Sequence, residues 1–498
     1  MSNDSDPVRT APRSAAPPQD LSPEEELRRV EVLLGREPDD ARLQVRKAQL
    51  QLALRQRRAA IESANRVASL PGAGAWELRL AAAVLGQCNA TAAARACLER
   101  ARGISPGHAV VLYDLALSYF FANDEDEAER CLDVVLRQFP QHGGALYLRS
   151  VLRTQTASRN HVEDLRARLA SGRGTPADAA ATHYALAKEY EDLGDHARAF
   201  AALQTGAKLK RRLLNYSSSD EIGALRAIES AFGPDAAAAA RPGCDREAPI
   251  FVLGIPRTGT TLVERMLSSH PDVESIGEFP DFPVLLREQA DRVIDESPGT
   301  ALTPAQASVR VDFAELGNRY LDSARQLCTG PRFVDKLPYN SLYCGHLVKA
   351  LPRARLIHVV RNPLDTCYAV YKTLFDRTYS YSYDFDELAD YFVAYRRLMD
   401  HWHRVVPGTI LDVAYEDLVN DPEREARRIL DWCNLDWNPA VLDFHRQSRD
   451  STTASAAQVR RPIYDSSVGK WRRYASELAP LRERLAAAGV PTGDTPAT

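Results

Sequence analysis

The chain has 498 residues, of which 45% are hydrophobic and 26% are charged, so it is long enough for two or three globular domains with sizeable cores. No apolar run approaches the roughly 18 residues of a membrane-spanning helix, and the polar N-terminal residues lack the apolar core of a signal peptide, which argues against a membrane protein. The net charge of −4 argues against a general nucleic-acid-binding protein.

The cysteines are scattered along the chain, with no C-x2-C pair and no regular spacing between them. This pattern predicts neither a zinc site nor a disulfide framework, so we expect a protein of the reducing cytoplasm that holds no metal ion. The positions concerned are Cys88, Cys97, Cys131, Cys244, Cys328, Cys344, Cys367 and Cys433.

Residues 1–22 are rich in Pro, Ser, Ala and Asp and lack periodicity, so we expect them to be disordered. Residues 23–235 have a helical pattern in which a proline recurs about every 34 residues from Pro38 to Pro176. Small residues such as Ala116 and Ala128 would let the two helices of a hairpin pack closely. The region resembles tetratricopeptide arrays, which implies a stacked solenoid whose groove could take a peptide or a partner protein. Chance periodicity in an alanine-rich helical region is the alternative.

The short apolar run from Ile250 to Leu253 predicts a buried strand, and helical spacing resumes after a tight loop. The loop has the pattern Gly254-x4-Gly259-Thr260-Thr261. Its backbone N–H groups would lie at the positive end of a helix, so the expected ligand is an anion. Thr260 replaces the lysine of the phosphate-loop pattern, which argues against triphosphate hydrolysis. An ordinary Gly/Pro/Thr turn is the alternative.

The run that begins RFVDK predicts a short strand, a helix from about Tyr339, a second strand from Arg355 to Val360, and another helix. The alternation predicts an α/β domain with a parallel sheet over residues 246–490, followed by a disordered tail over residues 491–498. Ligands of such sheets lie beyond the carboxyl ends of the strands. This rule would bring Lys336, Arg361 and the glycine-containing loop to one edge.

The order of these motifs resembles that of the sulfotransferases that use 3′-phosphoadenosine 5′-phosphosulfate (PAPS). The resemblance covers about residues 248–475 and implies a P-loop-like site that holds PAPS without a metal ion. It implies that the 5′-phosphosulfate is held by Arg257, Thr258, Gly259, Thr260 and Thr261.

The motif RNPLDTCYAVYK resembles the segment of this family that binds the 3′-phosphate, and Arg361 matches its phosphate-pairing arginine. A guanidinium group can pair with a phosphate through two hydrogen bonds, which gives this residue type a physical reason. The family usually has a serine eight positions after the arginine, where this chain has Ala369. Thr366 and Lys372 are the nearby candidates to replace that serine.

The C-terminal segment resembles the basic loop that covers the nucleotide in the same family. The resemblance rests on Gln458 to Arg460 and on the run GKWRRY, and it assigns Lys470, Trp471 and Arg472 to the PAPS site. A solvated basic run on the protein surface is the alternative.

Glu278, in the segment GEF, matches the catalytic glutamate of tyrosylprotein sulfotransferases and is the predicted general base. Lys336 matches the lysine that assists the leaving group, and Arg257 would add positive charge there. Ser455 lies where the tyrosylprotein enzymes have a second leaving-group contact. The histidines near the motifs, His270 and His346, do not fall where a base is expected.

The sequence therefore predicts an enzyme that transfers a sulfuryl group from PAPS to a hydroxyl acceptor, with a protein tyrosine as one candidate and with the repeats recruiting the acceptor. A carbohydrate or small-molecule acceptor is a second interpretation. A third is a tetratricopeptide interaction protein that binds PAPS or its product PAP without turnover, and Ala369 favours it. The sequence does not name the acceptor or the oligomeric state.

Overall fold

The computed structural model describes residues 21–239, 243–247, 249–376, 378–446, 463 and 467–493. An array of helices comes first and is followed by a parallel sheet with helices on both faces, so the predicted fold class is confirmed. Most of the two predicted disordered ends, residues 1–20 and 494–498, lies outside the described residues.

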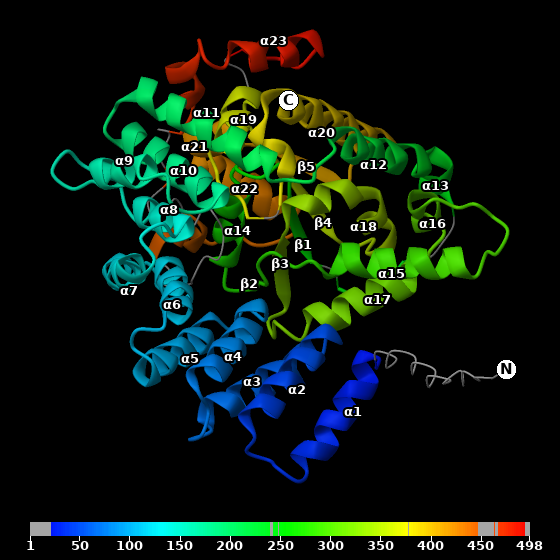
Figure 1. Cartoon of the computed structure of the whole chain (residues 1–498). Helices are drawn as coiled ribbons and strands as arrows, with labels where there is room; N and C mark the ends of the chain where they lie inside the picture. Colours follow the sequence, from blue (N-terminus) through cyan, green and yellow to red (C-terminus); the bar gives the residue numbers. More distant parts are fainter. Residues whose placement is uncertain are drawn as a thin grey trace, which may run out of the picture.

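The N-terminal array consists of helices that pack as consecutive antiparallel pairs and form a curve around one side of the sheet (Figure 1). The array comprises α1 (Pro23–Leu34), α2 (Ala41–Ala53), α3 (Arg57–Ser69), α4 (Ala75–Gln87), α5 (Thr91–Ile104), α6 (Ala109–Ala122), α7 (Glu125–Gln138), α8 (Gly143–Val151), α9 (Val162–Ala170), α10 (Pro176–Asp192) and α11 (His196–Arg212). Two further helices, α12 (Ser218–Ala231) and α13 (Pro234–Ala238), lead to the sheet.

Small buried residues allow the helices of each hairpin to approach closely. Ala116 in α6 and Ala128 in α7 are both fully buried. The turn between these two helices contains Asn123 in the left-handed conformation, and the side chain of Asp124 then caps α7 by accepting a hydrogen bond from the N–H of Glu127. Local sequence signals therefore set both the break between the helices and the close packing across it.

The strands that the structure describes form one five-stranded parallel sheet with the order β2-β3-β1-β4-β5. Their bounds are β1 Ile250–Leu253, β2 Val273–Ser275, β3 Arg332–Lys336, β4 Arg355–Val360 and β5 Ile410–Ala414. The strands β1, β3 and β4 lie where the sequence predicted strands. The short strand β2 was not predicted, because its three residues carry no apolar run.

Helices cover both faces of the sheet, so alternate residues of each strand enter two different cores. On β1, Val252 packs with the cluster that includes α14 (Thr260–Ser268) and α22 (Pro422–Trp432). Phe251 enters the other cluster. The remaining helices of this domain are α15 (Asp281–Asp295), α16 (Pro304–Ser308), α17 (Phe313–Ala324), α18 (Cys344–Ala350), α19 (Pro363–Tyr371), α20 (Phe385–Val405), α21 (Tyr415–Asn420) and α23 (Ala479–Ala487). The helix predicted from about Tyr339 is a 3₁₀ helix, η1 (Pro338–Tyr343), that continues into α18.

The repeats and the sheet domain share a continuous core, because Phe200 of α11 belongs to the same cluster as Phe251 of β1. Buried polar contacts reinforce this packing. The guanidinium group of Arg57 in α3 donates to both carboxylate oxygens of Asp281 in α15, at 2.6 and 2.8 Å. Within the described residues, none of the helices is both long enough and apolar enough to cross a bilayer.

Candidate functional site

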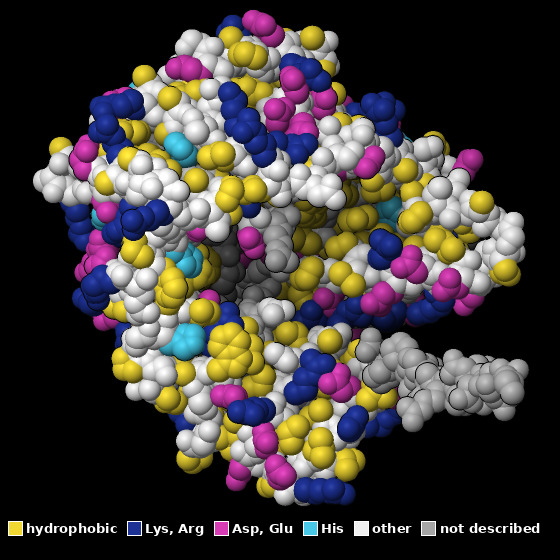
Figure 2. Space-filling model, viewed as in Figure 1, with side chains coloured by type: hydrophobic (Ala, Val, Ile, Leu, Met, Phe, Trp, Pro, Cys, Tyr) yellow, Lys and Arg dark blue, Asp and Glu magenta, His cyan; other side chains and the backbone are white. Residues whose placement is uncertain are grey.

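The predicted site residues gather where the strands end. The glycine-containing loop follows β1, Glu278 comes shortly after β2, Lys336 is the last residue of β3, and Arg361 follows β4. Because all five strands are parallel, these carboxyl ends meet at the same edge of the sheet. Figure 2 shows a hollow in the surface between the helices of the array and those of the sheet domain.

The loop between β1 and α14 follows a path that requires glycine at two positions. Gly254 has φ 146°, and a Cβ there would lie 2.8 Å from the carbonyl oxygen of Val359. Gly259 has φ 108°, and a Cβ there would lie 2.6 Å from the ring of Tyr415. Side chains at these positions would push the loop away from β4 and from the start of α21. Arg257, between the two glycines, also has a left-handed φ of 72°.

The hydroxyl residues of this loop are buried at the amino end of α14. Thr260 and Thr261 form its first turn, where backbone N–H groups have no partner within the helix, and their side chains are 4% and 5% exposed. The hydroxyl of Thr258 donates to the carbonyl of Ile255 at 2.9 Å and fixes the loop from within. A small anion at this turn would meet N–H groups and the positive end of the helix dipole.

The predicted base and the predicted leaving-group lysine are in direct contact. Nζ of Lys336 donates a hydrogen bond to Oε1 of Glu278. The lysine side chain is 1% exposed, whereas the Glu278 side chain is 44% exposed. The backbone N–H of Lys336 also donates to the carbonyl of Gly277 at 3.0 Å, so the two segments are joined by main chain and side chain.

A buried carboxyl group lies next to Lys336 along the strand. Asp335 is fully buried, and its Oδ2 accepts a hydrogen bond from the hydroxyl of Tyr320 at 2.7 Å. Burial raises the pKa of Asp335 to about 7, although hydrogen bonds oppose the shift. Burial therefore favours the protonated form of this carboxyl group.

Arg361 connects the loop to the C-terminal segment. Its guanidinium group donates to the carbonyl of Arg257 at 3.1 Å and to the carbonyl of Ser467 at 2.5 Å, and it lies over the ring of Tyr415 at 4.9 Å. Its Nε atom is buried and has no hydrogen-bond partner among the described residues. A buried donor without a partner is costly, so this N–H is well placed to receive an anionic ligand.

The segment with Lys470, Trp471 and Arg472, which the sequence assigned to the loop over the nucleotide, is attached to α19 through the carboxylate of Asp365. Asp365 accepts hydrogen bonds from the backbone N–H groups of Gly469 at 2.6 Å and Trp471 at 3.0 Å. Trp471 is buried, Lys470 is partly buried and Arg472 is exposed. The residues Lys470–Tyr474 form a 3₁₀ helix, η5, so this part of the predicted basic loop is helical. Sequence reasoning missed Asp365, which lies within the motif that follows Arg361.

Basic side chains cluster next to Arg361 on the side that faces the repeats. Lys372 bonds to Glu191 of α10 at 2.7 Å. Burial, and then the charges of Lys372 and other cations, lower the pKa of Lys470 below its ordinary value. Positive charge is therefore concentrated here, as expected for a phosphate site. Ala369 is buried on the same helix as Lys372, and its carbonyl accepts a hydrogen bond from Thr373.

The repeats also contact the segment that carries the predicted base. The side-chain amide of Asn89, in the turn between α4 and α5, donates a hydrogen bond to the carbonyl of Ile276, two residues before Glu278. On the other side, burial and then the carboxylate of Glu278 raise the pKa of Tyr379. The ring of Tyr379 stacks on that of Tyr339 with 5.0 Å between centroids. No sequence pattern indicated Asn89 or these rings, because they come from distant segments.

One set of predicted residues cannot be placed, and the two histidines near the motifs lie away from the site. Ser455 and the run from Gln458 to Arg460 lie outside the described residues. His270 is buried at the end of α14, where its ring bonds to the carbonyl of Asp436 at 3.0 Å. His346 is buried in α18, and burial lowers its pKa to about 3. Both histidines are therefore held in buried structural contacts.

Comparison with known protein families gives matches in both halves of the chain. Residues 249–439 match the model of the sulfotransferase family, and residues 71–152 and 180–212 match models of the tetratricopeptide repeat. The match thus begins at β1 and includes the loop, Glu278, Lys336 and Arg361.

Individual relatives and solved structures share between about a fifth and a third of their aligned residues with this chain. An uncharacterized protein of Aquifex aeolicus is 31% identical over 78% of this chain and 52% of its own length, so the chain spans about half of that relative. The protein-tyrosine sulfotransferase 1 of Danio rerio is 25% identical over 47% of this chain and 71% of its own length. Among solved structures, the sulfotransferase domain of a Synechococcus olefin synthase is 23% identical and covers 47% of this chain and 90% of that domain, with a TM-score of 0.35.

Proposed function

We propose that this chain, whose residues 249–439 match the sulfotransferase family model and which carries tetratricopeptide repeats before them, transfers a sulfuryl group from PAPS to a hydroxyl acceptor. The observation that carries the proposal is the contact between Glu278 and Lys336 at the edge where the phosphate-type loop opens. The transfer needs a group that accepts the acceptor's proton and a cation that stabilises the leaving oxygen. The carboxylate and the buried ammonium group at this place fit these two roles.

The residues that would hold PAPS fit a ligand with two separate anionic groups. The 5′ end would lie against the first turn of α14, and the 3′-phosphate would lie against the buried Nε of Arg361. The residues assigned to this site are Arg257, Thr258, Gly259, Thr260, Thr261, Arg361, Lys470, Trp471 and Arg472. When bound, PAPS supplies the sulfuryl group that the acceptor oxygen receives.

Glu278 acts as the general base in this proposal. Its side chain is 44% exposed, so an acceptor hydroxyl can reach it and give up its proton to a carboxylate oxygen. Lys336 cannot turn away into solvent, because it is 1% exposed. Its ammonium group therefore stays at the strand end, where it can stabilise the negative charge that develops on the leaving oxygen.

A protein tyrosine is the acceptor that we propose first. Tyr379 interacts with the charge of Glu278, and its ring stacks on that of Tyr339. Aromatic rings favour the approach of another aromatic ring. Asn89 brings the array to the segment just before the same carboxylate. This contact supports the proposal that a peptide bound by the repeats would present its tyrosine to the base.

The acceptor class can be tested directly with radiolabelled PAPS. Purified full-length protein would be incubated with pools of tyrosine peptides, sugars and simple phenols, and label transfer would be counted for each pool. We expect transfer to tyrosine peptides, and a reduced rate for a mutant in which Asn89 is replaced by alanine. Transfer to sugars alone would contradict the proposal of a tyrosine acceptor. Absence of transfer to all of the pools would contradict the proposal that the protein is a sulfuryl-transferring enzyme.

The alternative, a protein that binds PAPS or PAP without turnover, rests on Ala369. This residue stands where the family usually has a serine, and its place in α19 beside the basic cluster would put a hydroxyl near the 3′-phosphate. The variant Ala369→Ser should tighten PAP binding measured by calorimetry, by about tenfold or more for one added hydrogen bond to a charged group. An unchanged affinity would mean that another group already fills the role.

A further inference from the structure

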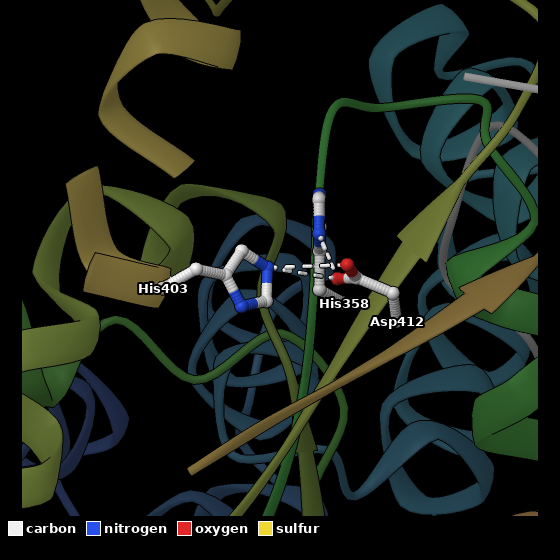
Figure 3. Close-up of side chains that lie close together, drawn as sticks. All are labelled: His358, His403 and Asp412. Atoms are coloured by element: carbon white, nitrogen blue, oxygen red, sulfur yellow. Dashed lines mark hydrogen bonds and ion pairs between the residues drawn. The ribbon is translucent and has the colours of Figure 1, made fainter. Parts of the chain in front are cut away.

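Two histidines and an aspartate gather at β4 and β5, on the opposite side of the sheet from β2 and Glu278 (Figure 3). His358 lies on β4 and Asp412 on β5, and the two residues are directly paired in the parallel register. His403 comes from the last turn of α20. Three elements that are distant in the sequence therefore bring three metal-ligand side chains together.

The ligand atoms of this cluster lie at the separations that a small cation requires. Nδ1 of His358 lies 2.7 Å from Oδ1 of Asp412, and Nε2 of His403 lies 3.1 Å from Oδ2 of the same carboxylate. All three ligand atoms lie within 4.8 Å of one another. A tetrahedral zinc ion with ligands at about 2.0–2.2 Å needs ligand atoms about 3.4 Å apart. Small side-chain movements would therefore suffice.

The surroundings of the cluster also fit a metal centre. The second ring nitrogen of His358 hydrogen-bonds to the hydroxyl of Tyr395 at 2.5 Å, and metal-binding histidines commonly use their other nitrogen in this way to fix the ring. A cavity of about 60 Å³ is lined by all three residues and by Asp400. This volume is sufficient for an ion with a bound water molecule.

We propose that His358, His403 and Asp412 bind one divalent transition-metal ion of the zinc class. Two imidazoles and one carboxylate suit zinc, and three protein ligands leave one position for water. The ion would join β4, β5 and α20 at a place where the cavity is also lined by Thr258 and Arg361. The ion would hold β4, the strand that Arg361 follows, in place against β5 and α20. It would not accept the acceptor's proton or stabilise the leaving oxygen, which are the roles proposed for Glu278 and Lys336.

This proposal departs from the prediction of a protein without a metal ion. That prediction came from the spacing of cysteines, and it could not detect ligands that are brought together by strand pairing between β4 and β5. A His–Asp–His group joined by hydrogen bonds alone is the arrangement against which the proposal must be tested.

The test is a titration of the full-length protein with zinc chloride after removal of metals by a chelator. We expect one zinc ion per chain by calorimetry and elemental analysis. Cobalt chloride should give the visible absorption of a four- or five-coordinate ion with nitrogen and oxygen ligands. The variants His403→Ala and Asp412→Asn should each lower zinc affinity by at least about tenfold, since loss of supporting contacts alone has that effect at known sites.

A matched control is His108→Gln, which removes a histidine of the repeat region that is not part of the cluster. It should leave zinc affinity unchanged. Circular dichroism would show whether each variant folds. The His403 side chain is 37% exposed, so we expect His403→Ala to fold and to provide the test even if Asp412→Asn does not fold. Absence of stoichiometric zinc binding by the unaltered protein, or equal affinity in His403→Ala, would overturn the proposal and leave a hydrogen-bonded cluster.

Discussion

Lys372 places its ammonium group 2.7 Å from the carboxylate of Glu191, and this ion pair joins the helix that follows Arg361 to helix α10 of the repeats. Tyr368, one turn earlier in α19, donates to the same carboxylate at 3.0 Å. Burial raises the pKa of Glu191, but the charge of Lys372 and further contacts bring it down to about 2. The repeats thus contribute a fixed negative charge to the basic region that is proposed to bind the 3′-phosphate.

Replacing Glu191 with glutamine should weaken the attachment of the repeats and strengthen anion binding. The folded-state pKa lies below the ordinary value of 4.5, so the stabilising contribution is present above about pH 4.5 and is lost as the pH falls toward 2. At pH 7 we expect a loss of about 2 kcal/mol in the free energy of unfolding, because the pair is partly buried. Denaturant unfolding would measure this, and PAP affinity should rise. The exposed Glu163→Gln is the control, and equal stability of the two variants would contradict the prediction.

Glu278→Gln should separate catalysis from binding. Glutamine keeps the size and polarity of the side chain but cannot accept the acceptor proton, so the rate of transfer should fall by about 10²–10⁴-fold. PAPS affinity should change little. Single-turnover release of PAP together with calorimetric binding would measure both quantities. Asp272→Asn, which changes an exposed carboxylate at the opposite end of β2, is the control, and undiminished turnover in Glu278→Gln would rule out the proposed base.

Lys336→Ala should affect both rate and affinity, in contrast to the glutamate variant. Removal of the ammonium group leaves the leaving oxygen without its cation and takes a positive charge from the neighbourhood of an anion. Transfer should slow by about 10²-fold or more, as for the loss of one such stabilising group, and PAPS binding should weaken. The same two assays apply, with the exposed Lys208→Ala as the control. A normal rate with weakened binding would restrict Lys336 to a binding role.

Asp335→Asn should change how stability depends on pH. Burial raises the pKa of Asp335 to about 7 from an ordinary 3.8, so the folded protein holds a proton that the unfolded chain has released between these values. Stability that this group contributes below pH 4 is therefore lost as the pH rises toward 7, by up to about 1.4 kcal/mol per pH unit. Asparagine does not titrate, so the variant should gain stability over the unaltered protein from pH 5 to pH 7.

Unfolding curves at several pH values would measure this difference, and Asp322→Asn, at a side chain that is 69% exposed, is the control. The gain should level off above about pH 7, where Asp335 is ionised in both states. A difference that stays constant across the whole range would show that the pKa is not raised.

PAPS should raise the melting temperature of the protein far more than ATP with magnesium. A ligand at 100 times its dissociation constant stabilises the folded state by about 2.7 kcal/mol. Thr260 stands where triphosphate-binding loops have lysine, so the loop lacks the charge that a β,γ-phosphate pair requires. Thermal scans with each nucleotide at equal concentration provide the measurement. Equal shifts would contradict the argument from Thr260.

Local sequence patterns were sufficient to predict the main secondary-structure elements near the site. The apolar run Ile250–Leu253 and the glycines around Arg257 predicted β1 and its loop, and the predicted strand Arg355–Val360 has the bounds of β4. These predictions succeeded because a buried parallel strand is a continuous apolar run and a tight loop needs glycine. The helix expected from Tyr339 begins instead as a 3₁₀ turn, since Pro338 and the packing of this segment against β1 set its geometry.

The sequence by itself determined the chemistry available to the proposed site: the residue types of the loop, the carboxylate Glu278, and the basic residues Lys336 and Arg361 in their order along the chain. The tertiary structure decided which of these residues touch and what else joins them. The contact of Lys336 with Glu278, the pairing of Lys372 with Glu191, and the cluster around Asp412 each join segments that are distant in sequence. Strand order and helix packing create such contacts, and neither is recorded in the spacing of residues along a single chain.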